Sequence, residues 1–159
     1  MRIKDISRIK GREVITIKPH ASISETLRQL VNNKIGAMPV CDFKGTLLGI
    51  ISERDIIRWL HRGNTDTART QVKDIMTYKV FTADPEDKLD IVLKTMTEKG
   101  IRHMPVMAGT RCVGILSLRD VIEQQVRNTP VRTEAREEYV AVSAAEPAKK
   151  PGVKVPSLT

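Results

Sequence analysis

The chain repeats itself, and this internal repeat restricts its fold more than any other feature of the sequence. The segment Ile15–Pro19 returns 66 residues later as Phe81–Pro85, and Ala37–Val40 returns at the same offset as His103–Val106, with Met-Pro-Val in both copies. Repeats of this kind indicate one short structural unit used twice.

The repeat continues through a third segment after a turn that is one residue shorter in the second copy. Gly49–Ile57 matches Gly114–Ile122 at an offset of 65 residues, including Ser, Arg and Asp at the same places. An upstream match joins Lys4–Ile6 to Lys73–Ile75, with three extra residues in the first copy. The matched segments therefore extend over most of each unit.

Each copy has the pattern strand, helix, strand, strand, helix. The first strand ends at Pro19 or Pro85, because proline cannot continue a sheet ladder. Ser22-x-x-Glu25 is a capping box for the first helix, and Asp87 is the expected N-cap in the second copy. This alternation of helices and short strands predicts an α/β fold of the α+β type.

Further signals place the helix ends. Apolar residues recur at helical spacing after both caps, and Gly100 is the expected stop of the second-copy helix. Ser52 and Ser117 are suited to cap the last helix of each unit. We therefore expect a first unit at residues 1–62, a polar linker at 63–71 and a second unit at 72–127.

The last part of the chain loses the pattern. Prolines interrupt residues 128–159, with Ala, Glu and Lys between them, so we expect a disordered tail. A weak helix over Arg132–Val142 is the alternative for part of it.

Composition restricts the class of protein. The 159 residues carry a formal net charge of +8, which favours anionic partners but is also typical of solubility alone. Cys41 and Cys112 have no metal-ligand or Cys-x-x-Cys spacing, so we expect two buried, reduced thiols. The charged start does not resemble a signal peptide, and Leu47–Ile51 is too short to span a bilayer. We expect a cytoplasmic protein.

Three repeated motifs resemble those of the CBS domain family, named after cystathionine β-synthase. They are the Thr-x-x-Pro strand end, the Met-Pro-Val strand, and Gly-x-x-Ser-x-Arg-Asp at the last helix, and the resemblance covers about residues 1–127. It implies two CBS units about a pseudo-twofold axis, with clefts for AMP, ADP, ATP, S-adenosylmethionine or NAD-type ligands. It also implies a homodimer, and, since no third domain is recognisable, a stand-alone pair that senses a ligand.

The Ser-x-x-Asp motifs are the candidate ribose sites. A carboxylate at a helix start can accept hydrogen bonds from both ribose hydroxyls, and the serine one turn earlier faces the same side. Asp55 and Asp120 match the acid that binds ribose in the family, with Ser52 and Ser117 beside them. The competing interpretation is that the serine only caps the helix and the acid only stabilises its first turn.

The remaining candidates would hold the base and the phosphates. The resemblance assigns adenine contacts to two strand edges in each copy: Thr16, Ile17, Gly36, Ala37 and Met38 in the first, and Thr82, Ala83, Arg102, His103 and Met104 in the second. The alternative interpretation of the methionines is that they belong to the core. Arg102, His103, Arg119 and Arg54 are the candidate phosphate ligands, although the last two also fit a solvated helix face. Gly36 and Ala37 replace Arg102 and His103 in the first copy, so the clefts should differ.

Catalysis is not expected. His20, His61 and His103 have no partner at a catalytic spacing, and no glycine-rich phosphate loop or metal-ligand set is present in the sequence. We therefore expect a regulatory adenine nucleotide rather than a catalytic cofactor. Two alternatives stay open: empty clefts in a purely structural pair, or a basic protein that binds nucleic acid or an acidic partner. Lys149, Lys150 and Lys154 are too sparse, and too far from aromatics, to favour nucleic acid.

Overall fold

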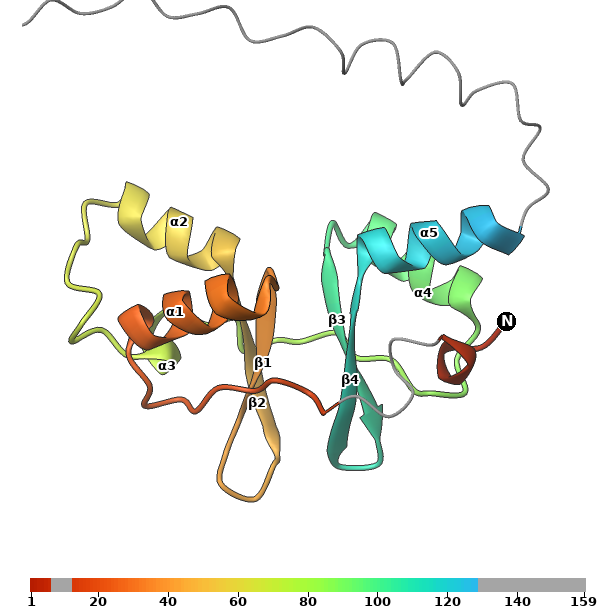
Figure 1. The fold of residues 1–159 in the computed structure, drawn as a ribbon, viewed down its shortest axis with the longest axis horizontal. Coiled ribbons are helices and arrows are strands. Elements are labelled where there is room, and N and C mark those ends of the chain that lie inside the picture. Colours follow the sequence, from red (N-terminus) through yellow and green to blue (C-terminus); the bar gives the residue numbers. More distant parts are fainter. Residues whose placement is uncertain (7–12, 129–159) are drawn as a thin grey trace, which may run out of the picture. The chain divides into compact units, whose positions relative to one another are not determined.

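The computed structural model describes residues 1–6 and 13–128, so the predicted tail and its alternative helix at Arg132–Val142 lie outside the described residues. Helices and two separate two-stranded sheets alternate along the chain, which confirms an α+β fold (Figure 1). The elements are η1 (Ile3–Asp5), α1 (Ile23–Asn33), β1 (Ala37–Cys41), β2 (Leu47–Ser52), α2 (Glu53–His61), α3 (Val72–Ile75), α4 (Leu89–Glu98), β3 (His103–Ala108), β4 (Arg111–Ser117) and α5 (Leu118–Asn128).

The two hairpins repeat each other in register. Pro39 faces Ile50 in the antiparallel pair β1–β2, and Pro105 faces Ile115 in the pair β3–β4. Each ladder shifts register directly after the valine of Met-Pro-Val. The sequence repeat is thus a repeat of backbone geometry.

The predicted first strand of each unit is reduced to a single parallel bridge. The Ile17 amide donates to the Pro39 carbonyl at 3.0 Å and the Ile17 carbonyl accepts from the Cys41 amide at 3.0 Å, and Ala83 makes the same pair of bonds on β3. The next bond of such a ladder would need an N–H two residues later, where Pro19 and Pro85 stand. The prolines therefore end the pairing after one residue.

Four of the expected helix signals, at Ser22, Ser52, Ser117 and Gly100, are found and one is displaced. The Ser22 hydroxyl accepts from the Glu25 amide at 3.1 Å at the start of α1, and Ser52 is the N-cap of α2. Gly100 follows the last turn of α4 with φ +63°, which suits glycine. The prediction of Asp87 as N-cap is wrong: α4 begins after Lys88, and the Asp87 carboxylate instead accepts from the Asp84 amide at 2.8 Å.

The short helices η1 and α3 are exchanged between the repeats. Ile3 and Ile6, which precede the first repeat, are buried in the core of the second, while Val72 and Met76, which precede the second repeat, are buried in the core of the first. The second core contains Ile3, Ile6, Ala83, Leu89, Val92, Met96, Met104, Val106, Leu116 and Val121. The first core contains Ile17, Ile23, Leu30, Met38, Val40, Ile51, Ile56, Val72 and Met76. The predicted boundaries at 62 and 72 separate the two repeats along the sequence. Each hydrophobic core, however, includes residues from both sides of these boundaries.

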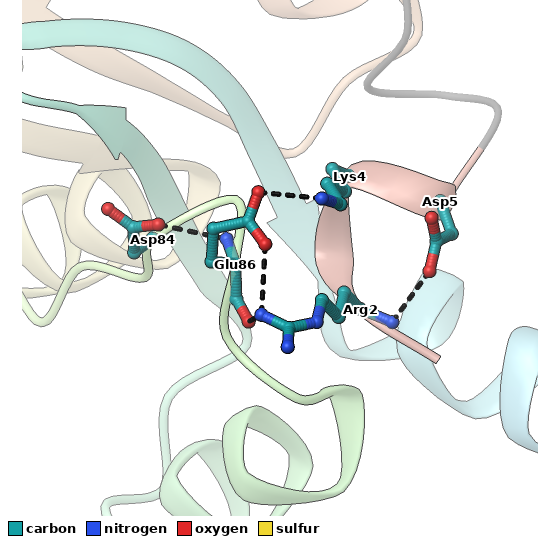
Figure 2. A network of polar contacts seen from close by, with 5 residues as sticks. All are labelled: Arg2, Lys4, Asp5, Asp84 and Glu86. Carbon is teal, nitrogen blue, oxygen red and sulfur yellow. Dashed lines mark hydrogen bonds and ion pairs between the residues drawn. The ribbon is translucent and has the colours of Figure 1, made fainter.

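Matched hydrogen bonds hold the exchanged segments. The Ile3 amide donates to the Asp87 carbonyl at 3.0 Å, and the Val72 amide makes the equivalent bond to the Ala21 carbonyl at 2.9 Å. Figure 2 shows an additional ionic contact at η1, where Glu86 lies between Arg2 and Lys4 at 2.9 and 2.8 Å. These charges are about half exposed, so we expect packing of the isoleucines to contribute more stability.

An antiparallel bridge joins Thr46 to Arg111, and these two residues are counterparts in the repeat. Two equivalent residues that meet face to face indicate a pseudo-twofold axis at this point, as expected. The free thiols Cys41 and Cys112 lie in the strands nearby, the first buried and the second half-buried. Burial, with a contribution from Cys112, raises the pKa of Cys41 to about 11, so this thiol stays protonated at neutral pH.

Candidate functional site

The two Ser-x-x-Asp motifs form the same reciprocal cap at the starts of α2 and α5. In each, the serine hydroxyl donates to the aspartate Oδ2 at 2.6 Å, and the aspartate amide donates back to the serine oxygen. The bonds of the cap to the carboxylate of Asp55 and of Asp120 all end at Oδ2, one of its two oxygens. Capping the helix and binding a ligand are therefore compatible roles for these residues.

Asp120 lies where two hollows meet. The smaller, about 180 Å³, has mostly aliphatic walls, and the larger, about 900 Å³, is rich in polar and charged groups. The smaller is lined by Glu13, Val14, Ile15, Ile35, Ala37, Val113, Gly114, Ile115 and Asp120. The larger is lined by Lys34, Gly36, Glu53, Arg102, His103, Ser117, Leu118, Arg119, Asp120, Ile122 and Glu123. We call the two together the Asp120 cleft.

Both repeats contribute to the Asp120 cleft. Arg102, His103 and Ser117 come from the second repeat, while Gly36 and Glu53 come from the first. Equivalent backbone bonds place the two walls: the Glu53 amide donates to the Gly36 carbonyl at 3.0 Å, and Leu118 bonds Arg102 in the same way at 2.8 Å. The walls of this cleft therefore depend on how the two repeats pack.

His103 lies against Gly36 in this cleft. A β-carbon on Gly36 would be 3.2 Å from the His103 Nε2 and 3.4 Å from the Glu53 Oε2, so glycine makes room for both side chains. Burial and the neighbouring Arg102 lower the pKa of His103, and the carboxylates of Glu53 and Asp120 only partly oppose this shift. The imidazole is consequently neutral at pH 7.

The surroundings of Asp55 are different. The Thr77 hydroxyl donates to its Oδ1 at 3.4 Å, so part of this carboxylate is engaged by the segment after α3. Asp55 borders a hollow of about 260 Å³ beside α3, together with Arg58, Trp59, Arg62, Asp74, Ile75 and Met76. None of the other first-repeat candidates lines that hollow, and Gly36 and Ala37 face the Asp120 cleft instead.

The remaining candidates lie in the core or at the surface. Met38 and Met104 are 0% and 2% exposed, which supports the interpretation of both as core residues. Ile17 and Ala83, the two residues that form the single parallel bridges, are also buried. Thr16 is half-buried, and Thr82 and Arg54 are exposed. Arg119 reaches the larger hollow, but its Nε is 2.8 Å from the Glu123 carboxylate.

Several residues of the cleft were not among the sequence candidates. Glu53 and the aliphatic residues Val14, Ile15 and Ile35 line it. Glu53 could have been found from the sequence, because the repeat aligns this glutamate with Leu118. A charged residue that only one copy has at a matched position is a candidate for a specific role. No such signal existed for the aliphatic wall, which resembles ordinary core.

Two other classes of site were searched in the same residues. Within 1–6 and 13–128, His, Cys, Asp and Glu side chains nowhere gather in a group that could hold a metal ion. Every helix of this part of the chain is too short or too polar to cross a membrane.

Two copies of one α+β unit, joined at a pseudo-twofold axis and sharing a cleft beside a Ser-x-x-Asp helix start, define a tandem two-core module rather than a single-core domain. A family model for the CBS domain matches residues 3–62 and again residues 72–127. The chain belongs to the CBS-domain family, as a tandem pair.

Solved structures agree with this assignment. The CBS-domain protein ATU1752 from Agrobacterium tumefaciens is 34% identical with a TM-score of 0.73, over 79% of this chain and 99% of that one. The CBS domain pair of protein MJ0100, solved in complex with 5′-methylthioadenosine and S-adenosyl-L-methionine, is 28% identical with a TM-score of 0.72, over 81% and 98%. The MJ1225 protein of Methanocaldococcus jannaschii is 31% identical over 118 residues, which are 74% of this chain but 41% of that protein. The chain thus spans about two fifths of this relative.

Proposed function

We propose that this CBS pair is a regulatory module that binds an adenosine-type ligand in the Asp120 cleft. The observation that carries the proposal is the position of Asp120, a helix-start carboxylate between an aliphatic hollow and a polar one. A nucleoside has the same order of parts: a flat base, a ribose with two hydroxyls and a polar 5′ substituent. The MJ0100 pair, which binds two adenosine compounds, supports this reading.

The proposed pose follows from the lining of the cleft. The base enters the smaller hollow between Ile15, Ile35 and Ile115, where apolar walls favour it. The ribose hydroxyls donate to the Asp120 carboxylate, as charge-assisted hydrogen bonds. The 5′ substituent then extends into the larger hollow toward Arg102 and His103.

The proposed mechanism is a shift between orientations of the two repeats. Because the walls of the cleft come from both repeats, a ligand binds best when they stand at one particular relative orientation. The ligand therefore increases the population of that orientation. The shift in the equilibrium cannot exceed the difference between the ligand's affinities for that orientation and for the other orientations. A partner that contacts both repeats would detect the change.

Calorimetric titration with 5′-methylthioadenosine, S-adenosylmethionine, AMP and ATP tests the proposal. At least one should bind the parent protein, and Asp120→Ala should weaken that binding about tenfold or more, because one charge-assisted bond contributes about 1.5–3 kcal/mol. Asp55→Ala is the matched control, since it removes the same cap from the other repeat; we expect it to change affinity less.

The outcomes separate the proposal from its alternatives. If Asp120→Ala binds like the parent while Asp55→Ala does not, the ligand occupies a different cleft. If no adenosine compound binds, the empty-cleft interpretation replaces ours. Binding to nucleic acid that weakens steeply with salt and is not displaced by adenosine compounds would favour the basic interaction protein.

Two further expectations belong with this proposal. A homodimer remains a prediction, supported by exposed apolar side chains on the last helix of each repeat, namely Ile57 and Leu60 on α2 and Ile122 and Val126 on α5. A cytoplasmic location, where adenosine metabolites are abundant, is the second.

A further inference from the structure

We infer that Glu53 makes the Asp120 cleft select adenosine ligands with a cationic or uncharged 5′ substituent over adenosine polyphosphates. This inference rests on the proposed function, because it concerns which adenosine compound the same cleft accepts. It identifies Glu53 as a specificity-determining residue and a 5′-sulfonium or 5′-thioether adenosine as the ligand class.

The position of Glu53 is well defined. It is the first residue of α2, and its amide donates to the Gly36 carbonyl at 3.0 Å, which holds the start of the helix at the wall of the cleft. Its Oε2 lies 3.4 Å from the point that a Gly36 β-carbon would occupy, and the His103 ring lies 3.2 Å from the same point. The carboxylate therefore faces the interior of the larger hollow beside His103, where the proposed pose places the 5′ substituent.

The charges around the larger hollow balance. Among the residues that the structure describes, its lining carries three cationic side chains and three carboxylates, namely Lys34, Arg102 and Arg119 against Glu53, Asp120 and Glu123. The cation of Arg119 is already paired with Glu123, and this arginine side chain is 86% exposed. His103 adds no charge at neutral pH, because burial and Arg102 lower its pKa.

A polyphosphate fits this balance poorly. It would bring several negative charges next to the Glu53 carboxylate, and like charges at short range repel. S-adenosylmethionine carries a sulfonium and an ammonium that Glu53 can attract, and a carboxylate that Arg102 can bind. Methylthioadenosine has no charge on its 5′ substituent and avoids the repulsion.

The difference between the repeats supports a role in recognition rather than in folding. The counterpart of Glu53 is Leu118, which packs against the second core. The first residue of this helix can therefore be apolar without loss of the cap that Ser117 and Asp120 form. The charge of Glu53 is not needed to start the helix.

Glu53→Gln tests the inference, because it keeps the size of the side chain and removes only its charge. Calorimetric titrations with S-adenosylmethionine, ATP and 5′-methylthioadenosine at neutral pH should show three results: weaker binding of S-adenosylmethionine by several-fold, tighter binding of ATP by a similar factor, and unchanged binding of methylthioadenosine. Glu98→Gln, which removes the same charge from α4 outside the cleft, should change none of the three affinities.

Each failure has its own meaning. If the parent binds ATP more tightly than methylthioadenosine, or if Glu53→Gln leaves the ratio of S-adenosylmethionine to ATP affinity unchanged, the inference is overturned while the proposed function stands. If Glu98→Gln shifts the ratio as much as Glu53→Gln, long-range charge rather than the cleft sets the preference, and the inference also fails. If the parent binds no adenosine compound at all, the proposed function itself is wrong.

Discussion

The two repeats share their backbone and differ in the side chains around one cleft. Hairpin register, the parallel bridge before the first helix and the Ser-Asp cap are the same in both. At the cleft, Arg102 and His103 of the second repeat stand where the first has Gly36 and Ala37, and Glu53 of the first stands where the second has Leu118. The shared positions thus account for the common backbone, and the specificity that we propose for the cleft rests on positions that differ.

The two helix-start carboxylates illustrate this division. Asp55 and Asp120 form the same cap, but Asp55 also accepts from Thr77, whereas Asp120 borders both hollows of the cleft. The comparison predicts one principal adenosine site rather than two equal ones. Variants at counterpart positions can break or sharpen this comparison.

The largest expected effect comes from the exchanged segments. Ile3 is 0% exposed in the second core, so Ile3→Ala should lower the free energy of unfolding by about 2–5 kcal/mol. Its counterpart Val72→Ala removes less apolar volume from the first core and should cost less. Chemical denaturation measures both. Ile91→Ala, at a site that is 57% exposed, is the control, and an Ile3→Ala effect no larger than the control would contradict the exchange.

Gly49 offers a second test, in the first repeat. A β-carbon there would lie 2.8 Å from the Thr77 carbonyl oxygen and 2.9 Å from the Met76 sulfur. Because a backbone atom cannot easily move away, Gly49→Ala should lower the free energy of unfolding by about 1–3 kcal/mol. Gly36→Ala meets only side-chain ends, of His103 and Glu53, and should cost less in thermal or chemical unfolding. Equal costs would show that the segment after α3 yields readily.

The smallest expected effect is the pH dependence that His103 adds to the second repeat. Its pKa is lowered in the folded chain, so the unfolded chain binds the proton more tightly. The stabilisation is complete above about pH 6.5, the unfolded value, and is lost as the pH falls through the folded pKa. His103→Gln should therefore show a flatter loss of melting temperature just below pH 6.5.

The carboxylates titrate in a separate, more acidic window. Backbone hydrogen bonds from Thr46 lower the pKa of Asp42, and Lys4 lowers that of Glu86, so their contributions persist to lower pH and disappear only below their ordinary values. Glu86→Gln should leave the slope near pH 6 unchanged. A His103→Gln profile that matches the parent near pH 6 would mean that His103 is not held neutral by its surroundings.

Local sequence signals predicted much of the fold. Ser22, Ser52 and Gly100 mark helix ends because each makes its bond within a few residues. The prediction of Asp87 as the N-cap was wrong because an aspartate carboxylate can accept from the first turn of a helix or from the turn before it. Here it accepts from the Asp84 amide in the preceding turn. The predicted strands that end at Pro19 and Pro85 are reduced to single bridges. The cause is the property from which their ends were predicted, because proline has no N–H to donate to the next bond of the ladder.

The composite cleft could not be predicted from the repeat. The alignment shows which residues are equivalent, but not which ones meet across the pseudo-twofold axis. The family resemblance assigned adenine contacts in the second copy to Thr82, Ala83 and Met104. The aliphatic wall of the described cleft comes from both repeats instead, from Val14, Ile15 and Ile35 of the first and from Val113 and Ile115 of the second. Met38 looked equally suited to a purine wall or a core, because both need an apolar side chain.

The exchange of η1 and α3 has a consequence for how such a chain can be inherited or rebuilt. No single cut yields two self-sufficient halves, since a cut before α3 leaves each half with the small helix of the other, and a cut after α3 leaves the second core without Ile3 and Ile6. A duplication, a gene fusion or a grafted sensor must therefore move the pair as one piece. The unit that evolution or engineering can transfer is then the tandem pair, even though the sequence consists of two similar repeats.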